Sequence, residues 1–342
     1  MIDLAAVRTW MDREGLGSGE LENVAPIGGG TQNVMLRFAR DGREFVLRRG
    51  PEHLRPGSNT VIAREFRVLG ALSNTDVPHP RLIASCDDTS VLGDAVFYLM
   101  DPIDGFNASL ELPAPAAGTP QLRREMGFAL VDALLSLGRV DFRDVGLADF
   151  GRPEGFLERQ VDRWLGELAS HQALPGYPDV ELPHVPEVAA WLRERVPTSW
   201  EPGLMHGDFH ACNVMFRRDA PKVAAIVDWE MATIGDPLLD LGWLMATWDL
   251  AGAPDEFAGL LTNAGGLPTA DELAERYAQG SDRALDHLPW YVVMACFKLG
   301  IILEGSHARA RSGLAPPEIG DRLHTTAQAL FERAHTLLTT TS

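Results

Sequence analysis

The sequence predicts an α+β protein with two lobes, a small antiparallel β-sheet lobe with one main helix and a large, mostly helical lobe. Residues 24–48 contain three strand-like segments separated by glycine-rich turns, whereas from Leu122 onward the apolar residues mostly follow helical spacing. The 342 residues are also enough for about two domains. We place the boundary near residues 100–105, which gives a nucleotide-binding N-terminal lobe of residues 1–100 and a catalytic and acceptor-binding C-terminal lobe of residues 101–342.

Each element of the small lobe follows from local spacing. Residues 3–14 carry Leu4, Val7 and Met11 at helical spacing, and residues 60–72 place four apolar side chains on one face, so both segments are expected to be helices. Asp41-Gly42 is a turn signal between two strand-like segments. Strands are expected at residues 24–27, 33–38, 44–48, 81–85 and 95–100.

The helical lobe is expected to be interrupted once. Residues 213–217 and 222–227 are short β-like segments joined by residues 218–221, which predicts a hairpin in helical surroundings. Trp243 and Trp248 are expected to lie in the core of this lobe.

The charge of the chain limits its partners. It has 48 acidic and 30 basic residues, a formal net charge of −18, and this excludes a general nucleic-acid binder because clustered cations are needed to neutralise phosphate backbones. Residues 1–100 have a net charge of −2 and residues 101–342 one of −16, which fits two lobes with different tasks or simply a solvated acidic surface. The only lysines are Lys222 and Lys298, so a mechanism that needs lysine has two candidates.

The remaining composition predicts a cytoplasmic protein. Three widely separated cysteines without metal-like spacing are typical of reduced thiols. The first residues have no basic flank before an apolar stretch, and apolar runs such as residues 290–297 are too short to cross a bilayer. We expect no secretion signal and no membrane partner, and the sequence leaves the oligomeric state open.

The densest group of polar residues is HGDFHACN at residues 206–213, followed by IVDWE at residues 226–230. Asp208, Asn213 and Asp228 are expected to converge on one side of the hairpin. Carboxylate and amide oxygens are ligands that Mg²⁺ accepts, which predicts Asp208 as a catalytic base and Asn213 and Asp228 as metal ligands. The alternative is a set of Asx turns and caps around the hairpin. Two Asp and one Asn at this spacing favour the metal site.

These two motifs resemble the catalytic loop and the metal-binding strand end of the aminoglycoside phosphotransferase-like family, relatives of the protein kinases in which HGDxxxxN replaces HRDxxxxN. IGDPLLDLGWLMATW at residues 234–248 and FVLRRGPEHL at residues 45–54 are most similar to the branch with the kinase-like domains of acyl-CoA dehydrogenase family members 10 and 11. The resemblance covers nearly the whole chain. It implies a bilobal protein-kinase-like fold, ATP and Mg²⁺ as cofactors, and transfer of the γ-phosphoryl group to a hydroxyl of a small molecule.

The chain departs from the family at one position. The family places a lysine on the third strand, against the α- and β-phosphates, and the matching residue here is Arg48. Arginine keeps its charge and can hold phosphate bidentately, so Arg48 is expected to take this role, with Glu65 as its ion-pair partner. A solvated helix acid is the alternative for Glu65. A nucleotide-binding pseudokinase or regulatory protein is the alternative for the chain, although the retained Asp208, Asn213 and Asp228 count against it.

The glycine run at residues 28–33 lies between two strands, so its backbone N–H groups can approach phosphates. No helix follows it directly, which disfavours a dinucleotide fingerprint. Beside the other motifs it predicts a cover over the nucleotide. Its expected contacts are Gly29, Gly30, Thr31 and Asn33, and Met100, where the lobes join, matches the family's backbone contact to adenine.

Other polar residues of these motifs are expected to support the loop. His206 is expected to be a scaffold rather than a proton carrier. His210 is expected to be a surface or hydrogen-bonded histidine, with a position facing the acceptor site as the alternative. Asp236 and Asp240 are expected to be caps or loop braces, with direct catalysis as the alternative. Lys298, Glu304, His307 and Arg309 either line an acceptor pocket or form the wet face of an amphipathic helix.

The sequence does not decide which small molecule accepts the phosphoryl group. An aminoglycoside would suit the acidic lobe, because a cleft of one sign concentrates ligands of the other. The branch resemblance instead implies a hydroxyacyl acceptor such as a hydroxyacyl-CoA, which we favour.

Overall fold

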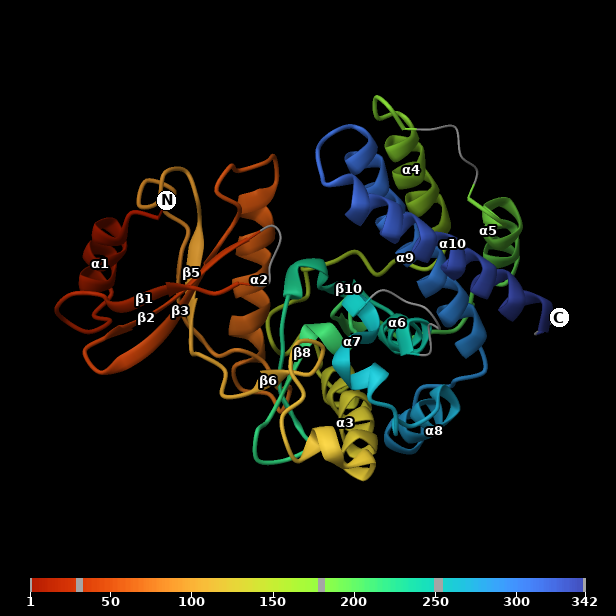
Figure 1. Cartoon of the computed structure of the whole chain (residues 1–342), viewed down its shortest axis with the longest axis horizontal. Coiled ribbons are helices and arrows are strands. Elements are labelled where there is room, and N and C mark those ends of the chain that lie inside the picture. Colours follow the sequence, from red (N-terminus) through yellow and green to blue (C-terminus); the bar gives the residue numbers. More distant parts are fainter. Residues whose placement is uncertain (1, 29–32, 178–181, 249–254, 341–342) are drawn as a thin grey trace.

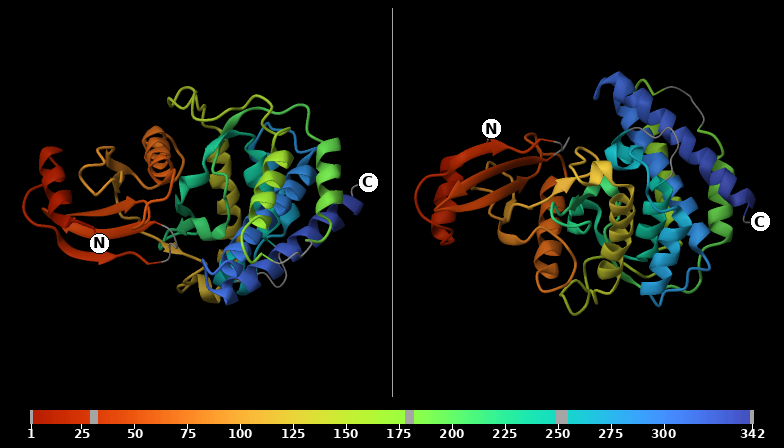
Figure 2. Two further views of the ribbon diagram at one scale, coloured as in Figure 1. Left: turned by 90° about the horizontal axis from the view of Figure 1, so that it is seen from above. Right: turned by 60° about the horizontal axis from the view of Figure 1, so that its bottom comes forward.

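The computed structural model describes residues 2–28, 33–177, 182–248 and 255–340. Figure 1 shows a β-sheet with two helices at one end of the molecule and a helical body at the other. The views in Figure 2 separate the same two parts. The predicted α+β class is confirmed. The boundary near residues 100–105 lies after the last strand of the sheet, which ends at Met100, and the predicted division of tasks between the lobes stays a prediction.

The small lobe is a five-stranded antiparallel sheet with the order β1-β2-β3-β5-β4. Asp41 and Gly42 both have positive φ, which is the backbone that a two-residue hairpin turn between β2 and β3 requires. Every helix and strand predicted for this lobe is present, with ends that differ by a few residues. Its elements are α1 (Leu4–Arg13), β1 (Glu22–Pro26), β2 (Val34–Arg40), β3 (Arg43–Arg49), α2 (Ser58–Leu72), β4 (Leu82–Cys86) and β5 (Phe97–Met100).

Alternation along β3 decides which side chains face which helix. Phe45 and Leu47 pack in a core cluster with residues of α1, whereas Val46 packs in the cluster that contains the buried face of α2. Successive side chains of a strand point to opposite faces. Arg48 therefore lies on the same face as Val46 and points toward α2.

The large lobe contains more β structure than predicted. The expected hairpin is β8 and β9, but β6 adds a third strand to it, and β7 and β10 form a separate two-stranded sheet. The prediction of a single interruption was wrong because strands of two or three residues carry too little alternation to be recognised. The β and 3₁₀ elements are β6 (Phe106–Asn107), η1 (Ala116–Gly118), β7 (Gly203–Met205), η2 (Ala211–Asn213), β8 (Val214–Phe216), β9 (Val223–Ile226), η3 (Trp229–Met231) and β10 (Thr233–Gly235).

Eight helices make up the rest of the described part of this lobe, with α9 at its centre. They are α3 (Pro120–Gly138), α4 (Gln160–Gln172), α5 (Val185–Glu194), α6 (Leu238–Trp248), α7 (Asp255–Asn263), α8 (Ala270–Gly280), α9 (Leu288–Arg311) and α10 (Pro317–Thr340). Helix α6 approaches α9 closely at Gly242, where a Cβ atom would lie 2.6 Å from the backbone of Tyr291. Trp243 and Trp248 are buried in the core, as predicted.

Helix α9 is longer than the apolar run at residues 290–297 suggested. Among the described residues it is the one helix whose length and composition would allow it to cross a membrane. However, 78% of its most apolar window is buried inside the protein. This burial is what a core helix of a helical lobe requires, and the same test is met by many such helices.

Candidate functional site

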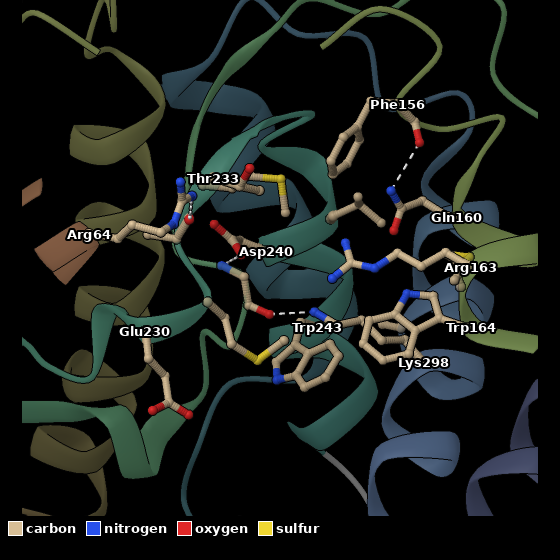
Figure 3. A pocket seen from close by; sticks show the side chains of 17 residues that line it. Arg64, Phe156, Gln160, Arg163, Trp164, Glu230, Thr233, Asp240, Trp243 and Lys298 are labelled. Carbon is tan, nitrogen blue, oxygen red and sulfur yellow. Dashed lines mark hydrogen bonds between the residues drawn. The ribbon is translucent and has the colours of Figure 1, made fainter. Parts of the chain in front are cut away.

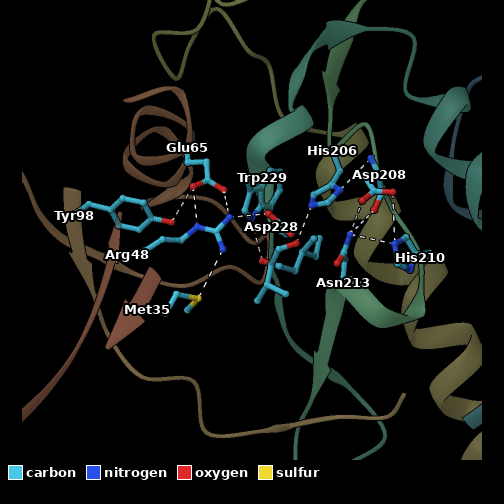
Figure 4. A network of polar contacts seen from close by, with 12 residues as sticks. Met35, Arg48, Glu65, Tyr98, His206, Asp208, His210, Asn213, Asp228 and Trp229 are labelled. Carbon is cyan, nitrogen blue, oxygen red and sulfur yellow. Dashed lines mark hydrogen bonds and ion pairs between the residues drawn. The ribbon is translucent and has the colours of Figure 1, made fainter. Parts of the chain in front are cut away.

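Arg48 and Glu65 form a buried, two-pronged ion pair between β3 and α2 (Figure 4). Arg48 Nε donates to Glu65 Oε2 at 2.9 Å and Nη2 donates to Oε1 at 2.8 Å. Tyr98, opposite Arg48 in the sheet, directs its hydroxyl to the same carboxylate at 3.5 Å. The side chain of Glu65 is 1% exposed, so the predicted pairing is present and the alternative of a solvated helix acid is wrong.

The same guanidinium also reaches the other lobe. Arg48 Nη2 donates to Asp228 Oδ1 at 2.7 Å. Burial raises the pKa of Glu65 to about 7, because Arg48 opposes this effect only in part and the Asp228 carboxylate adds to it. One arginine is thus shared by two carboxylates. Removing one member of such a buried group typically costs about 3–5 kcal/mol, because it leaves the others without compensation.

Asp228 follows β9 in a left-handed backbone conformation, with φ 67° and ψ 64°. Asp tolerates this region better than most residues, and strained positions of this kind concentrate at functional sites. Its side chain is 39% exposed. The residue before it, Val227, donates its N–H to the carbonyl of Asn213 at 2.9 Å, so the end of β9 is tied directly to the segment that precedes β8.

Asp208 and Asn213 face each other across the turn at residues 208–213 (Figure 4). Asn213 Nδ2 donates to the Asp208 carbonyl at 3.0 Å and to its carboxylate Oδ2 at 2.9 Å. The other carboxylate oxygen lies 3.5 Å from His210 Nε2. Burial would raise the pKa of Asp208, but the imidazole of His210 outweighs it, and the pKa is lowered. His210 is therefore a buried partner of Asp208, and the prediction that it is hydrogen-bonded holds, whereas a surface position is excluded.

These contacts leave two oxygen-bearing side chains, Asn213 and Asp228, that could ligate a hard cation. The amide nitrogen of Asn213 is directed at Asp208, so the amide oxygen is the atom of this side chain that can ligate a metal. The partly exposed carboxylate of Asp228 lies at the end of the paired strand. One amide oxygen and one carboxylate are ligands of the type that Mg²⁺ accepts, and Mg²⁺ commonly completes its coordination with water and phosphate oxygens.

The backbone that carries Asp208 is held by a buried carboxylate. Asp240, on α6, accepts the N–H of His206 at 2.6 Å and the N–H of Gly207 at 2.8 Å. Gly207 has φ +85°, and a Cβ atom there would lie 2.4 Å from the carbonyl oxygen of Met231, so only glycine fits. His206 Nε2 lies 3.0 Å from the carbonyl of Val227. Asp240 and His206 brace the loop, as predicted, while Asp236 caps the first turn of α6.

Lys298 supports the loop from behind. Its ammonium donates to the carbonyl of Gly207 at 2.6 Å and lies 4.3 Å from the ring centre of Trp243. Burial lowers the pKa of Lys298 to about 8, although Asp208 and Asp240 act in the opposite direction. The small lobe has Arg48 at the position where the family places a lysine, whereas Lys298 holds the turn that carries Asp208.

The predicted contacts of the glycine loop fall into two groups. Gly29, Gly30 and Thr31 lie outside the described residues. Asn33 is described, and its side chain is hydrogen-bonded to Glu230, which links the base of the loop to the segment after Asp228. Met100 ends β5 with a buried side chain, next to the segment that joins the lobes.

A cavity of about 270 Å³ lies beside the turn at residues 206–213 (Figure 3). Gly207 and Asp240 form part of its wall. Arg163 on α4 directs its guanidinium into it, as Figure 3 shows. The positively charged residues of its lining are Arg64, Arg163 and Lys298, the negatively charged ones are Glu230 and Asp240, and Trp164 and Trp243 are among the apolar ones.

Sequence reasoning missed several of these residues. Glu230 was part of a recognised motif but had no assigned role, although it lines the cavity and contacts Asn33. Arg163 and Trp164 belong to no recognisable sequence motif, because α4 reaches the site only through tertiary packing. Of the four polar residues noted on α9, only Lys298 lines the cavity, whereas Glu304, His307 and Arg309 do not.

We predict that Asp240→Asn destabilises the protein and slows turnover. An amide offers one acceptor oxygen where the carboxylate offers two, so one of the two buried N–H groups loses its acceptor, at a cost of about 1–3 kcal/mol. Urea unfolding without ligand measures the loss of stability. Asp282→Asn, at an exposed position, is the matched control. Equal unfolding midpoints for the two variants would show that Asp240 does not brace the loop.

Comparison with known proteins identifies the family of this chain. Residues 23–278 match the family model described as the phosphotransferase enzyme family. Human acyl-CoA dehydrogenase family member 11 is 30% identical over 297 residues, which are 84% of this chain and 36% of that protein. Mouse acyl-CoA dehydrogenase family member 10 is 28% identical over 278 residues, which are 80% of this chain and 25% of that protein. The chain thus spans little more than a third, or less, of these relatives.

Solved structures show the same fold. A Ralstonia eutropha JMP134 protein assigned as an aminoglycoside phosphotransferase has 28% identity and a TM-score of 0.80, over 98% of this chain and 99% of that chain. The aminoglycoside phosphotransferase APH(4)-Ia, solved with AMP-PNP and hygromycin B, has a TM-score of 0.62 at 12% identity, over 95% of this chain and 98% of that chain, and shows the fold alone. The match of the family model over most of its length shows that this chain belongs to the phosphotransferase enzyme family.

Proposed function

We propose that the protein transfers the γ-phosphoryl group of ATP to a hydroxyl group of a small molecule, with Mg²⁺ as cofactor. The observation that carries this proposal is the arrangement of Asp208, Asn213 and Asp228 around the end of one hairpin, with Arg48 reaching Asp228 from the other lobe. Phosphoryl transfer depends mainly on positioning and on neutralising phosphate charge. The site offers both.

In this mechanism Asp208 orients the acceptor hydroxyl and takes its proton. The lowered pKa of Asp208 keeps the carboxylate ionised near neutral pH, so it can act as a base. The acceptor oxygen then forms its bond to the γ-phosphorus, and the bond between that phosphorus and the β–γ bridging oxygen breaks, so that ADP leaves. Mg²⁺ held by Asn213 and Asp228 would neutralise charge on the β- and γ-phosphates.

Arg48 is proposed to contact the α- and β-phosphates in place of the family lysine. Its bidentate pairing with Glu65 fixes the guanidinium plane and still leaves Nη1 facing Met35 Sδ, a weak acceptor at 3.7 Å. A phosphate oxygen is a far stronger acceptor for this donor. Gly29, Gly30, Thr31 and Asn33 would cover the phosphates, and the backbone at Met100 would contact the base.

The second candidate is a nucleotide-binding pseudokinase. It is favoured by one observation, namely that Arg48 is bonded to Asp228, a proposed metal ligand. In that case the ion pair would hold the metal position closed. Turnover that depends on Mg²⁺ distinguishes the two, since a pseudokinase has none with any acceptor.

We predict that Asp208→Ala lowers kcat by about 10²- to 10⁴-fold, the range that a positioned general base contributes. Binding of ATP with Mg²⁺, measured by calorimetry, should survive, because Asp208 is proposed to contact the acceptor rather than the nucleotide. Asp219→Ala, on the exposed turn between β8 and β9, is the control. Near wild-type turnover by Asp208→Ala would refute its assignment as the base.

The cavity beside the loop favours an acceptor with an anionic or hydrogen-bond-accepting group. The indole N–H groups of Trp164 and Trp243 are buried and have no acceptor within the described part of the chain. The Arg163 guanidinium also forms no hydrogen bond to another described residue. Asp240 is already occupied by the two loop N–H groups. The lining has three cations, Arg64, Arg163 and Lys298, against Glu230 and the occupied Asp240. This balance suits a hydroxyacyl compound better than a polycationic aminoglycoside.

This local pattern differs from the net charge of the lobe. The charge of −16 on residues 101–342 acts at long range, where salt screens it over a Debye length of about 8 Å. Groups in the cavity wall contact the acceptor directly. At about 270 Å³ the cavity is slightly smaller than typical ligand pockets, which measure about 300–1,000 Å³. It could hold the hydroxyacyl end of a larger acceptor.

We predict that Arg163→Ala raises KM for a hydroxyacyl acceptor by about 10- to 100-fold, since a hydrogen bond to a charged group contributes about 1.5–3 kcal/mol. ATP consumption is compared across amino sugars, choline-like alcohols and hydroxyacyl-CoAs. Arg195→Ala is the matched control, because Arg195 lies 5.3 Å from Trp191 much as Arg163 lies 5.2 Å from Trp164. Preferred turnover of an amino sugar, unaffected by Arg163→Ala, would contradict the acceptor assignment.

A further inference from the structure

A second group of titratable side chains lies between α9 and α10, apart from the residues that line the catalytic cavity. Glu304 and His307 stand one turn apart on α9, and Asp321 and His324 stand one turn apart on α10. Each helix therefore presents one acid and one histidine at i and i+3 positions, which lie on the same helix face. Figures 1 and 2 show these two helices packed side by side near the C-terminus.

The contacts within this group are short. His324 Nδ1 lies 2.7 Å from Glu304 Oε2, and the hydroxyl of Tyr177 donates to Glu304 Oε1 at 2.5 Å. The rings of His307 and His324 are stacked, with centres 4.5 Å apart. The ligand atoms of Glu304, His307 and His324 all lie within 4.8 Å of one another. Asp321, which is exposed, places Oδ1 3.5 Å from His307 Nδ1.

Two side chains of this group are buried, so their polar atoms need partners. Glu304 is 0% exposed and His307 is 5% exposed. A buried carboxylate is costly unless it is paired, and a buried imidazole nitrogen is costly unless it is bonded. His307 Nδ1 is buried and has no hydrogen-bond partner among the residues that the structure describes. Hydrogen bonds within the group thus satisfy Glu304, whereas His307 Nδ1 has only the 3.5 Å ion-pair contact to Asp321 and no hydrogen bond within the described part of the chain.

We propose that Glu304, His307 and His324 bind a divalent transition-metal ion of the zinc type, with the exposed carboxylate of Asp321 or water as the remaining ligand. Two imidazoles and a carboxylate suit Zn²⁺ and its neighbours rather than Mg²⁺ or Ca²⁺, which prefer oxygen ligands. In a tetrahedral site with metal–ligand distances of about 2.1 Å, ligand atoms are roughly 3.4 Å apart. The three ligand atoms, at present up to 4.8 Å apart, would have to approach by up to about 1.4 Å to reach that spacing.

The site would join α9 to α10 and thereby steady the helix that carries Lys298. Lys298 lies six positions before Glu304 on α9 and donates to the carbonyl of Gly207 in the catalytic turn. The proposed ion does not take part in phosphoryl transfer. The metal site is independent of the acceptor and of the proposed function, and it can be tested without an activity assay.

The test is Zn²⁺ binding to the full, untagged chain after removal of metals with a chelator. The Asp228→Asn background keeps the candidate Mg²⁺ ligands from contributing. We expect one Zn²⁺ per chain in competition with a chromophoric chelator, and Co²⁺ should give the visible absorption of a nitrogen- and oxygen-ligated ion. His307→Gln and His324→Gln should each weaken binding by at least about 100-fold, more than the roughly 10- to 100-fold loss typical of outer-shell changes.

His287→Gln is the matched control, because His287 is an exposed histidine at the start of the same helix and makes no capping hydrogen bond. It should leave Zn²⁺ affinity unchanged. Circular dichroism of the metal-free variants checks folding, and Glu304→Gln provides a further variant of similar size. The proposal is refuted if the parent protein binds no stoichiometric Zn²⁺, or if folded His307→Gln and His324→Gln bind it as tightly as His287→Gln does.

Discussion

The arrangement of the site depends on one guanidinium. Arg48 is placed on the α2 side of β3 by strand alternation, and there it is held by both oxygens of Glu65 and by Asp228. Two of these groups belong to the small lobe and one to the large lobe. This ion-pair network therefore ties the sheet to the end of β9, beside the backbone hydrogen bond from Ile226 N–H to the Pro78 carbonyl. Arginine suits this role better than lysine, because its planar fork can bond two carboxylates at once and its charge is permanent.

The turn at residues 206–213 is held by hydrogen bonds to its backbone rather than by an ion pair. Backbone N–H groups of His206 and Gly207 are held by the buried carboxylate of Asp240, and the carbonyl of Gly207 is held by Lys298. Asp208 thus projects from a segment whose polar groups are bonded on both sides. Preorganisation of this kind would place the proposed base, Asp208, without reorganisation during the reaction. The lysine that the small lobe lacks is replaced there by Arg48, while the lysine of α9 has a structural task.

Features that depend on neighbouring residues in the chain could be predicted from the sequence. The helices and strands of the small lobe follow from periodicity, and Asp208, Asn213 and Asp228 stand in two short motifs whose strands pair with each other. The short strands β6, β7 and β10 were missed because two or three residues are too few to show alternation. Arg163 and Trp164 were missed because their helix meets the loop only after folding. The roles of Gly29, Gly30 and Thr31 stay predictions, since these residues lie outside the described part of the chain.

The most direct test of this account is a crystal structure with Mg²⁺ and a non-hydrolysable ATP analogue. The Arg48–Asp228 contact now occupies one carboxylate oxygen that the proposed metal would share. The account predicts Mg²⁺ bound by Asn213 and Asp228, with Arg48 still paired to Glu65 and within hydrogen-bond distance of a phosphate oxygen. An analogue bound without contact to Arg48, or with its metal held by other residues, would contradict it.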